Sequence, residues 1–220
     1  MTAHTLAPHH HPDPAVLLDY AAGSLREPLA LAVATHLWFC RTCRDTVADA
    51  EAVGGALLDA FSVAGDGDIG LAEVLARLDE PAAAALTHRA PIAADVPGPL
   101  RHYVQGALPA QPWRAMTKSL ATVDLTTDVP GYRVRLLRIA AGAAMPRHTH
   151  RGTEVTVVLK GGYSDELGRF APGDVAATDP AVAHQPMADA DQDCYCLAVT
   201  DAPVRLVGWL GVLLNPFVRF

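Results

Sequence analysis

The sequence predicts an α+β protein of two domains, an N-terminal helical bundle followed by a C-terminal antiparallel β-barrel. Three observations predict this fold class. Apolar residues recur at helical spacing through the first eighty residues, short β-type runs bounded by Gly, Pro and Asp follow Trp113, and the stretch between is rich in Pro and Ala. We therefore expect domains over residues 1–85 and 113–220, joined by a Pro-rich linker over residues 86–112.

Four helices are expected in the N-terminal domain. Residues 15–22 have apolar side chains at helical spacing, and Gly23 ends that helix. Pro28 opens the second helix, and the third and fourth cover residues 44–61 and 71–78. In the C-terminal domain, strands separated by turn residues indicate the antiparallel barrel, and the apolar run VGWLGVLL predicts a short closing helix.

The helical domain contains a candidate zinc site. His36, Cys40 and Cys43 stand as H-x3-C-x2-C, and on one continuous helix these positions share a face. Two thiolates and an imidazole favour zinc over a redox role, because a redox CxxC pair normally begins a helix that follows a strand. A closed site needs a fourth ligand, which the histidines before the first helix can supply: His11, the nearest, or His4, His9 or His10.

A second candidate metal site lies in the barrel, where His148, His150 and Glu154 stand as H-x-H-x3-E. Alternate residues of a strand point to one face, so the two imidazoles share a direction. A turn at Arg151-Gly152 can bring Glu154 toward them, and His184 can close the site. This mixed N/O set suits a divalent ion: zinc is expected first, with manganese, iron, nickel and copper as alternatives.

The barrel site resembles the first motif of the cupins. The intervals G-x5-H-x-H-x3-E-x6-G are matched at every position from Gly142 to Gly161. The second cupin motif is matched in part, by Ala171-Pro172-Gly173-Asp174 and His184. The resemblance implies a barrel of cupin type.

A zinc-type helical domain followed by a cupin-like barrel resembles the ChrR family of zinc-dependent anti-sigma factors. The resemblance covers nearly the whole chain and is carried by LLDYAAGSL, ATHLWFCRTC, PLRHYVQGAL, HTHRGTEVTVVLKG and DCYCLAVTDAPVRL. It implies two metal sites. The first consists of His11, His36, Cys40 and Cys43, and His11 is chosen for its distance before Tyr20. The second consists of His148, His150, Glu154 and His184. The resemblance also implies that the protein is no enzyme. Its partner would be an extracytoplasmic-function sigma factor, held inactive and released on a singlet oxygen-type oxidative signal.

Composition and charge agree with a regulatory protein that binds another protein. The net charge of −7 argues against a basic nucleic-acid-binding face. No signal peptide and no apolar run of transmembrane length is recognised, so a cytoplasmic protein without membrane contact is expected. The alternative function is a cupin metalloenzyme, a dioxygenase or isomerase, with an accessory helical domain. The H-x3-C-x2-C domain favours the anti-sigma reading, because such an enzyme needs no module of this kind.

Two further pairs of residues have both a functional and a structural interpretation. Cys194 and Cys196 are expected on one face of a strand, either as small core residues or as a redox pair. Asp165 and Glu166 follow a barrel turn and are expected to be solvated rather than functional.

Overall fold

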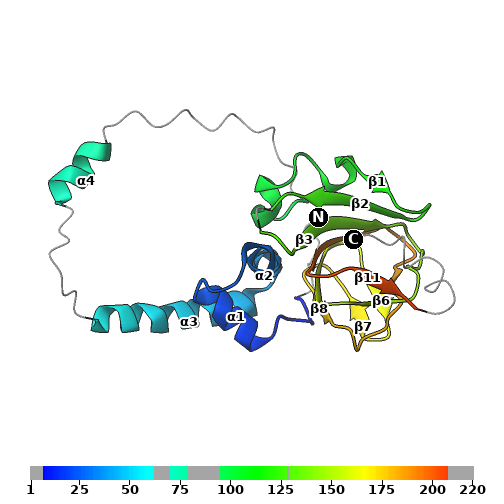
Figure 1. Cartoon of the computed structure of the whole chain (residues 1–220), viewed down its shortest axis with the longest axis horizontal. Helices are drawn as coiled ribbons and strands as arrows, with labels where there is room; N and C mark the ends of the chain where they lie inside the picture. The colour runs from blue at the N-terminus through cyan, green and yellow to red at the C-terminus, as the bar shows by residue number, and fades with distance from the viewer. Residues whose placement is uncertain (1–6, 62–69, 79–94, 128, 208–220) are drawn as a thin grey trace.

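The computed structural model describes residues 7–61, 70–78, 95–127 and 129–207. The α+β architecture has the predicted order, with helices first and antiparallel sheets after them (Figure 1). The predicted closing helix, VGWLGVLL, lies outside the described residues except for Val207.

The four predicted helices are present, with bounds within a few residues of those expected. They are α1 Pro14–Ala21, α2 Glu27–Phe39, α3 Arg41–Ala60 and α4 Leu71–Leu78. Asp13 caps α1, because its side chain accepts a hydrogen bond from the backbone N–H of Ala15. A small core holds α1, α2 and α3 together through Leu17, Val33 and Val47. Within the described part of the chain, no helix has the length and apolar character that a membrane span requires.

Three antiparallel sheets make up the barrel. The largest has the strand order β1-β2-β3-β10-β5-β8, and the two smaller ones are β11-β4 and β7-β6-β9. The strands are β1 Arg114–Ala115, β2 Leu120–Leu125, β3 Arg133–Ile139, β4 His148–His150, β5 Glu154–Lys160, β6 Tyr163–Asp165, β7 Gly168–Phe170, β8 Val175–Thr178, β9 Met187–Ala188, β10 Cys194–Thr200 and β11 Val204–Leu206. Two isolated bridges add to these sheets, one between Ala144 and Met187 of β9 and one between His184 and His148 of β4.

The large sheet is buried on both faces. Along β10, Leu197 and Val199 belong to one hydrophobic cluster, whereas Cys194 and Cys196 belong to another on the opposite face. Every residue of β10 is buried, which explains why this strand has a continuous apolar run instead of an alternating one. Of the barrel's metal-ligand residues, the large sheet carries Glu154 of β5, whereas His148 and His150 come from β4 of a small sheet.

The first face of the large sheet is covered by a segment that the sequence analysis assigned to the linker. Val96, Leu100, Val104 and Leu108 are buried, with exposures between 0 and 3%. The 3-10 helices η1 (Gly98–His102) and η2 (Leu108–Ala110) help to bring them into the same cluster as the strands. The prediction of a linker over residues 86–112 is therefore wrong for its described part, 95–112, since apolar residues every four positions bury it against the barrel.

Helix α2 packs against the same face of the sheet. Leu31 and Ala32 belong to the hydrophobic cluster that contains Val157 of β5 and Leu197 of β10. The opposite side of α2, with Val33 and Leu37, faces the small core of the helices. The helices and the barrel therefore share a core across α2, which differs from the expected arrangement of two domains separated by a linker (Figure 1).

A second connection is the N-terminal strap, residues 8–11, which lies along the barrel turn before β8. The Asp174 carboxylate accepts hydrogen bonds from the backbone N–H groups of His9 at 2.6 Å and His10 at 2.8 Å. The carbonyl of His10 accepts one from the backbone N–H of Val175 at 3.0 Å. The strap thus continues the barrel's hydrogen bonding and fixes the position of His11.

Replacing Asp174 by Ala should destabilise the protein strongly. Asp174 is 1% exposed, and it also accepts a hydrogen bond from the backbone N–H of Ala171. Three backbone donors would lose their acceptor, so we expect the free energy of unfolding to fall by about 3 kcal/mol. Urea denaturation measures this loss. The matched control is Asp179→Ala, which removes an exposed carboxylate that bonds to Ala181. Equal effects of the two substitutions would contradict the role given to Asp174.

Candidate metal centres and an adjoining cavity

The first candidate metal centre joins three parts of the chain. His11 comes from the N-terminal strap, His36 from α2, and Cys40 and Cys43 from the junction of α2 with α3. The four ligand atoms lie within 4.8 Å of one another. His11 Nδ1 is 3.4 Å from the Sγ atoms of both cysteines. Of the candidate fourth ligands in the described chain, His11 is the one that lies in the cluster.

The expectation that His36, Cys40 and Cys43 share one helix is wrong, although they do converge. The chain leaves the helical conformation at Cys40, whose φ of −101° and ψ of 109° end α2 and begin α3. Cys40 is the N-cap of α3, and its sulfur accepts a hydrogen bond from the backbone N–H of Cys43 at 3.4 Å. Both sulfurs therefore lie at the N-terminus of α3.

His36 is oriented by the barrel. Its Nδ1–H donates to the carbonyl of Gly173 at 2.6 Å, so Nε2 carries the lone pair. That Nε2 atom is buried, and no hydrogen-bond partner for it occurs among the described residues. Burial lowers the pKa of His36, which favours the neutral imidazole that binds metals.

The turn that supplies this carbonyl requires glycine. Gly173 has a φ of +94°, and a Cβ there would lie 2.6 Å from Cβ of Phe39 and 2.7 Å from Cγ of Pro8. The strap and the end of α2 thus approach the barrel turn at the same point. The first candidate centre is built on the surface of the barrel.

Protonation of the cysteines also bears on metal binding. Burial, followed by the hydrogen bond and the charge of Cys40, raises the pKa of Cys43 to about 12. With its pKa raised in this way, Cys43 reaches the thiolate form only beside a cation. The donor set of two sulfurs and two imidazole nitrogens therefore fits a metal ion.

The second candidate metal centre brings together His148 and His150 of β4, Glu154 at the start of β5, and His184. Their ligand atoms lie within 4.8 Å of one another and all four residues are at least partly buried in the barrel. His150 Nε2 is 3.3 Å from His184 Nε2 and 3.8 Å from Glu154 Oε1. The predicted turn at Arg151-Gly152 is present between β4 and β5.

Two of these histidines are oriented by hydrogen bonds to their Nδ1 atoms. His148 Nδ1–H donates to the carbonyl of Pro146 at 2.8 Å, and His184 Nδ1–H donates to Asp165 Oδ2 at 2.8 Å. In both rings Nε2 is left to face the cluster. The Asp165 side chain is 0% exposed, so the expectation of a solvated carboxylate was wrong for Asp165. It holds for Glu166, which is exposed.

Burial sets the protonation of this cluster. It lowers the pKa of His148 and lowers that of His150 to about 4, so both rings are neutral near pH 7. Burial raises the pKa of Glu154, against the opposing charges of His148, His184 and Arg135. The cluster therefore offers the neutral imidazoles of His148 and His150, together with His184 and a Glu154 carboxyl group that a cation would ionise.

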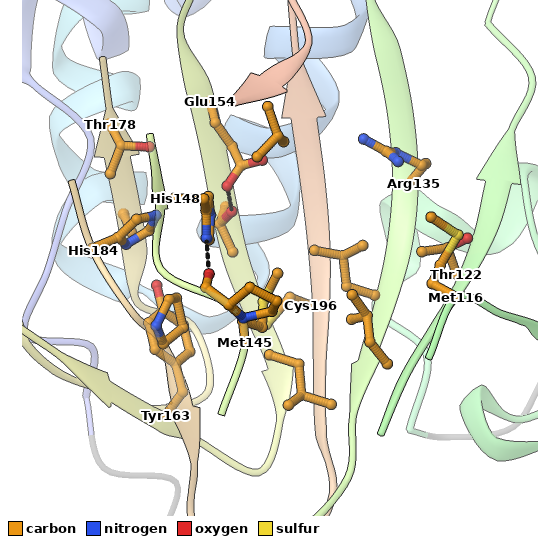
Figure 2. Close-up of a pocket in the computed structure, with 18 of the residues that line it drawn as sticks. Met116, Thr122, Arg135, Met145, His148, Glu154, Tyr163, Thr178, His184 and Cys196 are labelled. Carbon is orange, nitrogen blue, oxygen red and sulfur yellow. Dashed lines mark hydrogen bonds between the residues drawn. The ribbon is translucent and has the colours of Figure 1, made fainter. Parts of the chain in front are cut away.

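A cavity of about 360 Å³ adjoins the second centre (Figure 2). His148, Glu154 and His184 line it, together with Arg135 of β3. The rest of its wall is largely apolar and includes Met116, Leu120, Leu137, Ile139, Met145 and Leu206. Arg135 was not singled out from the sequence, but it alternates with Leu137 and Ile139 on β3, and a charged residue on an inward face was a readable signal.

Cys194 and Cys196 occupy one face of β10, as predicted, and both are buried. Their sulfurs are 3.5 Å apart, and both residues are free cysteines. The hydrogen bond to Cys194, together with burial, raises the pKa of Cys196 well above its ordinary value, so it remains a thiol. Both residues contribute to the core, and Cys196 also lines the cavity.

Comparisons with known proteins agree with this structure along the chain. Residues 104–203 match a family model described as the ChrR cupin-like domain. The anti-sigma-E factor ChrR of Cereibacter sphaeroides is 41% identical over 214 residues, which cover 96% of this chain and 98% of that protein. The crystal structure of Rhodobacter sphaeroides SigE in complex with the anti-sigma ChrR contains a similar chain, with a TM-score of 0.78 and 38% identity, over 88% of this chain and 100% of that one. The resemblance therefore extends through both candidate centres, and the chain belongs to the ChrR family of anti-sigma factors.

Proposed function

We propose that this protein binds an extracytoplasmic-function sigma factor through its helices, holds it inactive, and releases it on an oxidative signal of the singlet-oxygen type. The similar chain of known structure is in complex with SigE, which supports a sigma factor as the partner. Family membership decides against the alternative of a cupin metalloenzyme, because the full-length relative is an anti-sigma factor. Inhibition would result from occlusion of the surfaces that the sigma factor uses for RNA polymerase.

The observation that carries this proposal is an exposed apolar surface on α3, which extends away from the barrel (Figure 1). We call it the α3 patch: Val53, Leu57, Leu58 and Phe61, which are between 58 and 74% exposed. Neighbouring apolar side chains with this exposure on one helix are typical of a protein-binding surface. Inhibition of transcription by the purified full-length chain, and its co-purification with the sigma factor, test the proposal. Transcription that is insensitive to the chain would refute it.

We propose that zinc occupies the first centre and has a structural role. His11, His36, Cys40 and Cys43 are a complete N/S ligand set for tetrahedral zinc, with no position left for a substrate. The buried Nε2 of His36 supports this assignment, since it has no hydrogen-bond partner in the described chain. Zinc there would connect the strap to the start of α3, and so help to hold α3 in place.

We propose that the second centre binds a divalent ion, with zinc expected first and manganese, iron or nickel as alternatives. Three imidazoles and a carboxylate suit all of these ions. Under this proposal the barrel receives the oxidative signal and the helices hold the sigma factor. The shared core at α2 and the strap would carry the change between them, because release requires a signal that alters the free-energy difference between bound and free states.

Asp165→Asn should weaken metal binding in the barrel by about 10- to 100-fold, because Asp165 orients His184. Chelator competition on the cobalt-loaded full-length chain measures the effect, since thiolate absorption distinguishes the first centre from the second. The neighbouring Glu166→Gln is the matched control, as Glu166 is exposed and bonds to Gln185 and Arg147 instead. Loss of cobalt from the thiolate site, or equal effects of both substitutions, would contradict the assignment.

A further inference from the structure

Tyr163 of β6 is a buried tyrosine that lines the cavity beside the second centre. It is 4% exposed, and its side chain extends from β6 toward the metal-ligand residues (Figure 2). Its ring stacks on that of Phe170 at 4.8 Å between centroids, which fixes its direction. Within the described chain, no residue accepts a hydrogen bond from its hydroxyl group. Buried tyrosine hydroxyl groups usually have a partner, so a molecule in the cavity is the candidate acceptor.

The Tyr163 hydroxyl group is a donor at neutral pH. Burial, together with nearby charges that include those of Asp165 and Glu154, raises the pKa of Tyr163 well above its ordinary value. The phenol therefore keeps its proton, and it can donate a hydrogen bond to an oxygen atom of a ligand. Because the charge of Glu154 acts on this hydroxyl group, the hydroxyl group lies at the metal-ligand end of the cavity.

The rest of the cavity offers mainly apolar surface, contributed by Leu120, Leu137, Ile139 and Met145 among others. Its volume of about 360 Å³ is within the size range of small-molecule sites. A ligand that fills this space would bury mainly hydrocarbon, with an oxygen atom at the end near Tyr163.

The buried charges favour a ligand without net charge. A divalent ion at the second centre would be balanced by the carboxylates of Glu154 and Asp165, and the Asp165 side chain is 0% exposed. Arg135, which also lines the cavity, stands opposite Asp124 in the register of β2 and β3, and the Asp124 carboxylate favours its charged form. An added anion would therefore bring a buried charge without a counterion, which is costly.

We propose that the cavity binds an uncharged, largely hydrocarbon molecule with a hydroxyl or carbonyl oxygen, and that the Tyr163 hydroxyl group donates a hydrogen bond to this oxygen. The inference rests on the metal proposed for the second centre, and it names what the barrel would hold beside that ion. The hydrocarbon body of the ligand packs against the leucine, isoleucine and methionine side chains of the wall. Occupancy of the cavity then gives the barrel an input that differs from the ion itself.

Titration of the full-length, zinc-loaded chain with 2-naphthol tests the proposal, and naphthalene and 2-naphthoate are the comparison ligands. The fluorescence of the naphthalene ring reports the binding of all three. The naphthol should bind about 10-fold more tightly than naphthalene, because naphthalene has no oxygen that can accept from Tyr163. It should also bind at least about 10-fold more tightly than 2-naphthoate, whose charge would have no counterion. Equal affinities for 2-naphthol and naphthalene, equal or tighter binding of 2-naphthoate, or no binding of 2-naphthol would overturn the proposal.

Tyr163→Phe should lower the affinity for 2-naphthol by about 10-fold and leave that for naphthalene unchanged, because it removes the hydroxyl group and keeps the stacked ring. Tyr195→Phe is the matched control. Tyr195 is 5% exposed, but it belongs to the hydrophobic cluster on the other face of the large sheet. Equal losses of 2-naphthol affinity in the two variants would contradict the role given to Tyr163. Should Tyr163→Phe fail to fold, the ligand series on the natural chain decides alone.

The outcomes also separate this inference from the proposed function. A barrel that holds metal and does not bind 2-naphthol overturns the ligand class alone. A barrel that holds no metal overturns the metal assignment and this inference together. Neither result alters the sigma-factor proposal, since the titration contains no sigma factor.

Discussion

Replacing both Cys40 and Cys43 by Ser should remove one zinc ion per chain and abolish sigma-factor binding. Two of the four ligands of the first centre are lost, and structural zinc sites of this type contribute apparent binding free energies of about 10 to 16 kcal/mol. Without the ion, the strap and the start of α3 lose the link that the four ligands provide. We expect the affinity for the sigma factor to fall by at least about 100-fold, because α3 carries the proposed binding surface.

The matched control removes the other two cysteines. Cys194→Ala with Cys196→Ala leaves both candidate centres intact, so the zinc content and sigma-factor binding should be retained. Metal analysis measures the zinc content of both variants, and a pull-down with the sigma factor measures their binding to it. Full zinc content in the Cys40/Cys43 variant would show that these residues are not ligands. Loss of zinc with unchanged binding would show that the ion does not position the binding surface.

Replacing both Leu57 and Phe61 by Asp should abolish sigma-factor binding while leaving the fold and both metals intact. The two side chains are 58% and 74% exposed, so their replacement leaves no cavity. In a complex they would be buried, and two carboxylates would then be placed against an apolar surface. We expect the dissociation constant to rise by at least about 100-fold, as for central apolar residues of protein interfaces.

The matched control is Leu167→Asp, a similar substitution of an exposed leucine between β6 and β7 of the barrel. It should leave the dissociation constant unchanged. Zinc content and the thermal unfolding midpoint of both variants confirm that the fold is retained. Unaltered affinity of the Leu57/Phe61 variant would remove the α3 patch from the proposed interface.

The sequence predicts the four helices, the antiparallel sheets and the residues that cluster at the two candidate centres. Ligand spacing is a strong signal because a strand places alternate side chains on one face, as it does His148 and His150 of β4, and the turn that follows brings Glu154 to them. The packing of α2 against the sheet does not follow from helical spacing alone, which does not show whether an apolar side meets the other helices or the barrel. A helix that is apolar all around is buried on more than one side, and Leu31 and Val33 were already evidence for this.

The residues that orient the ligands were harder to predict than the ligands. Asp165 lies next to Glu166 in a similar sequence context, yet one is buried against His184 and the other is exposed. Local sequence does not distinguish them, because the difference depends on which strand end meets His184 across the barrel. The Pro-rich composition was equally misleading for residues 95–112, since proline restricts the backbone but does not prevent burial.

The hydrogen bonds of the strap also determine the order in which the protein can be assembled on the ribosome. His11 is among the first residues synthesised, but Asp174, which holds the neighbouring His10, follows 164 residues later. The carbonyl of Gly173, which orients His36, is equally late. The first metal centre can therefore reach its final geometry only after synthesis has passed the turn before β8. Under the proposed function, a newly made chain would become able to hold its partner only when the barrel, the proposed receiver of the signal, is nearly complete.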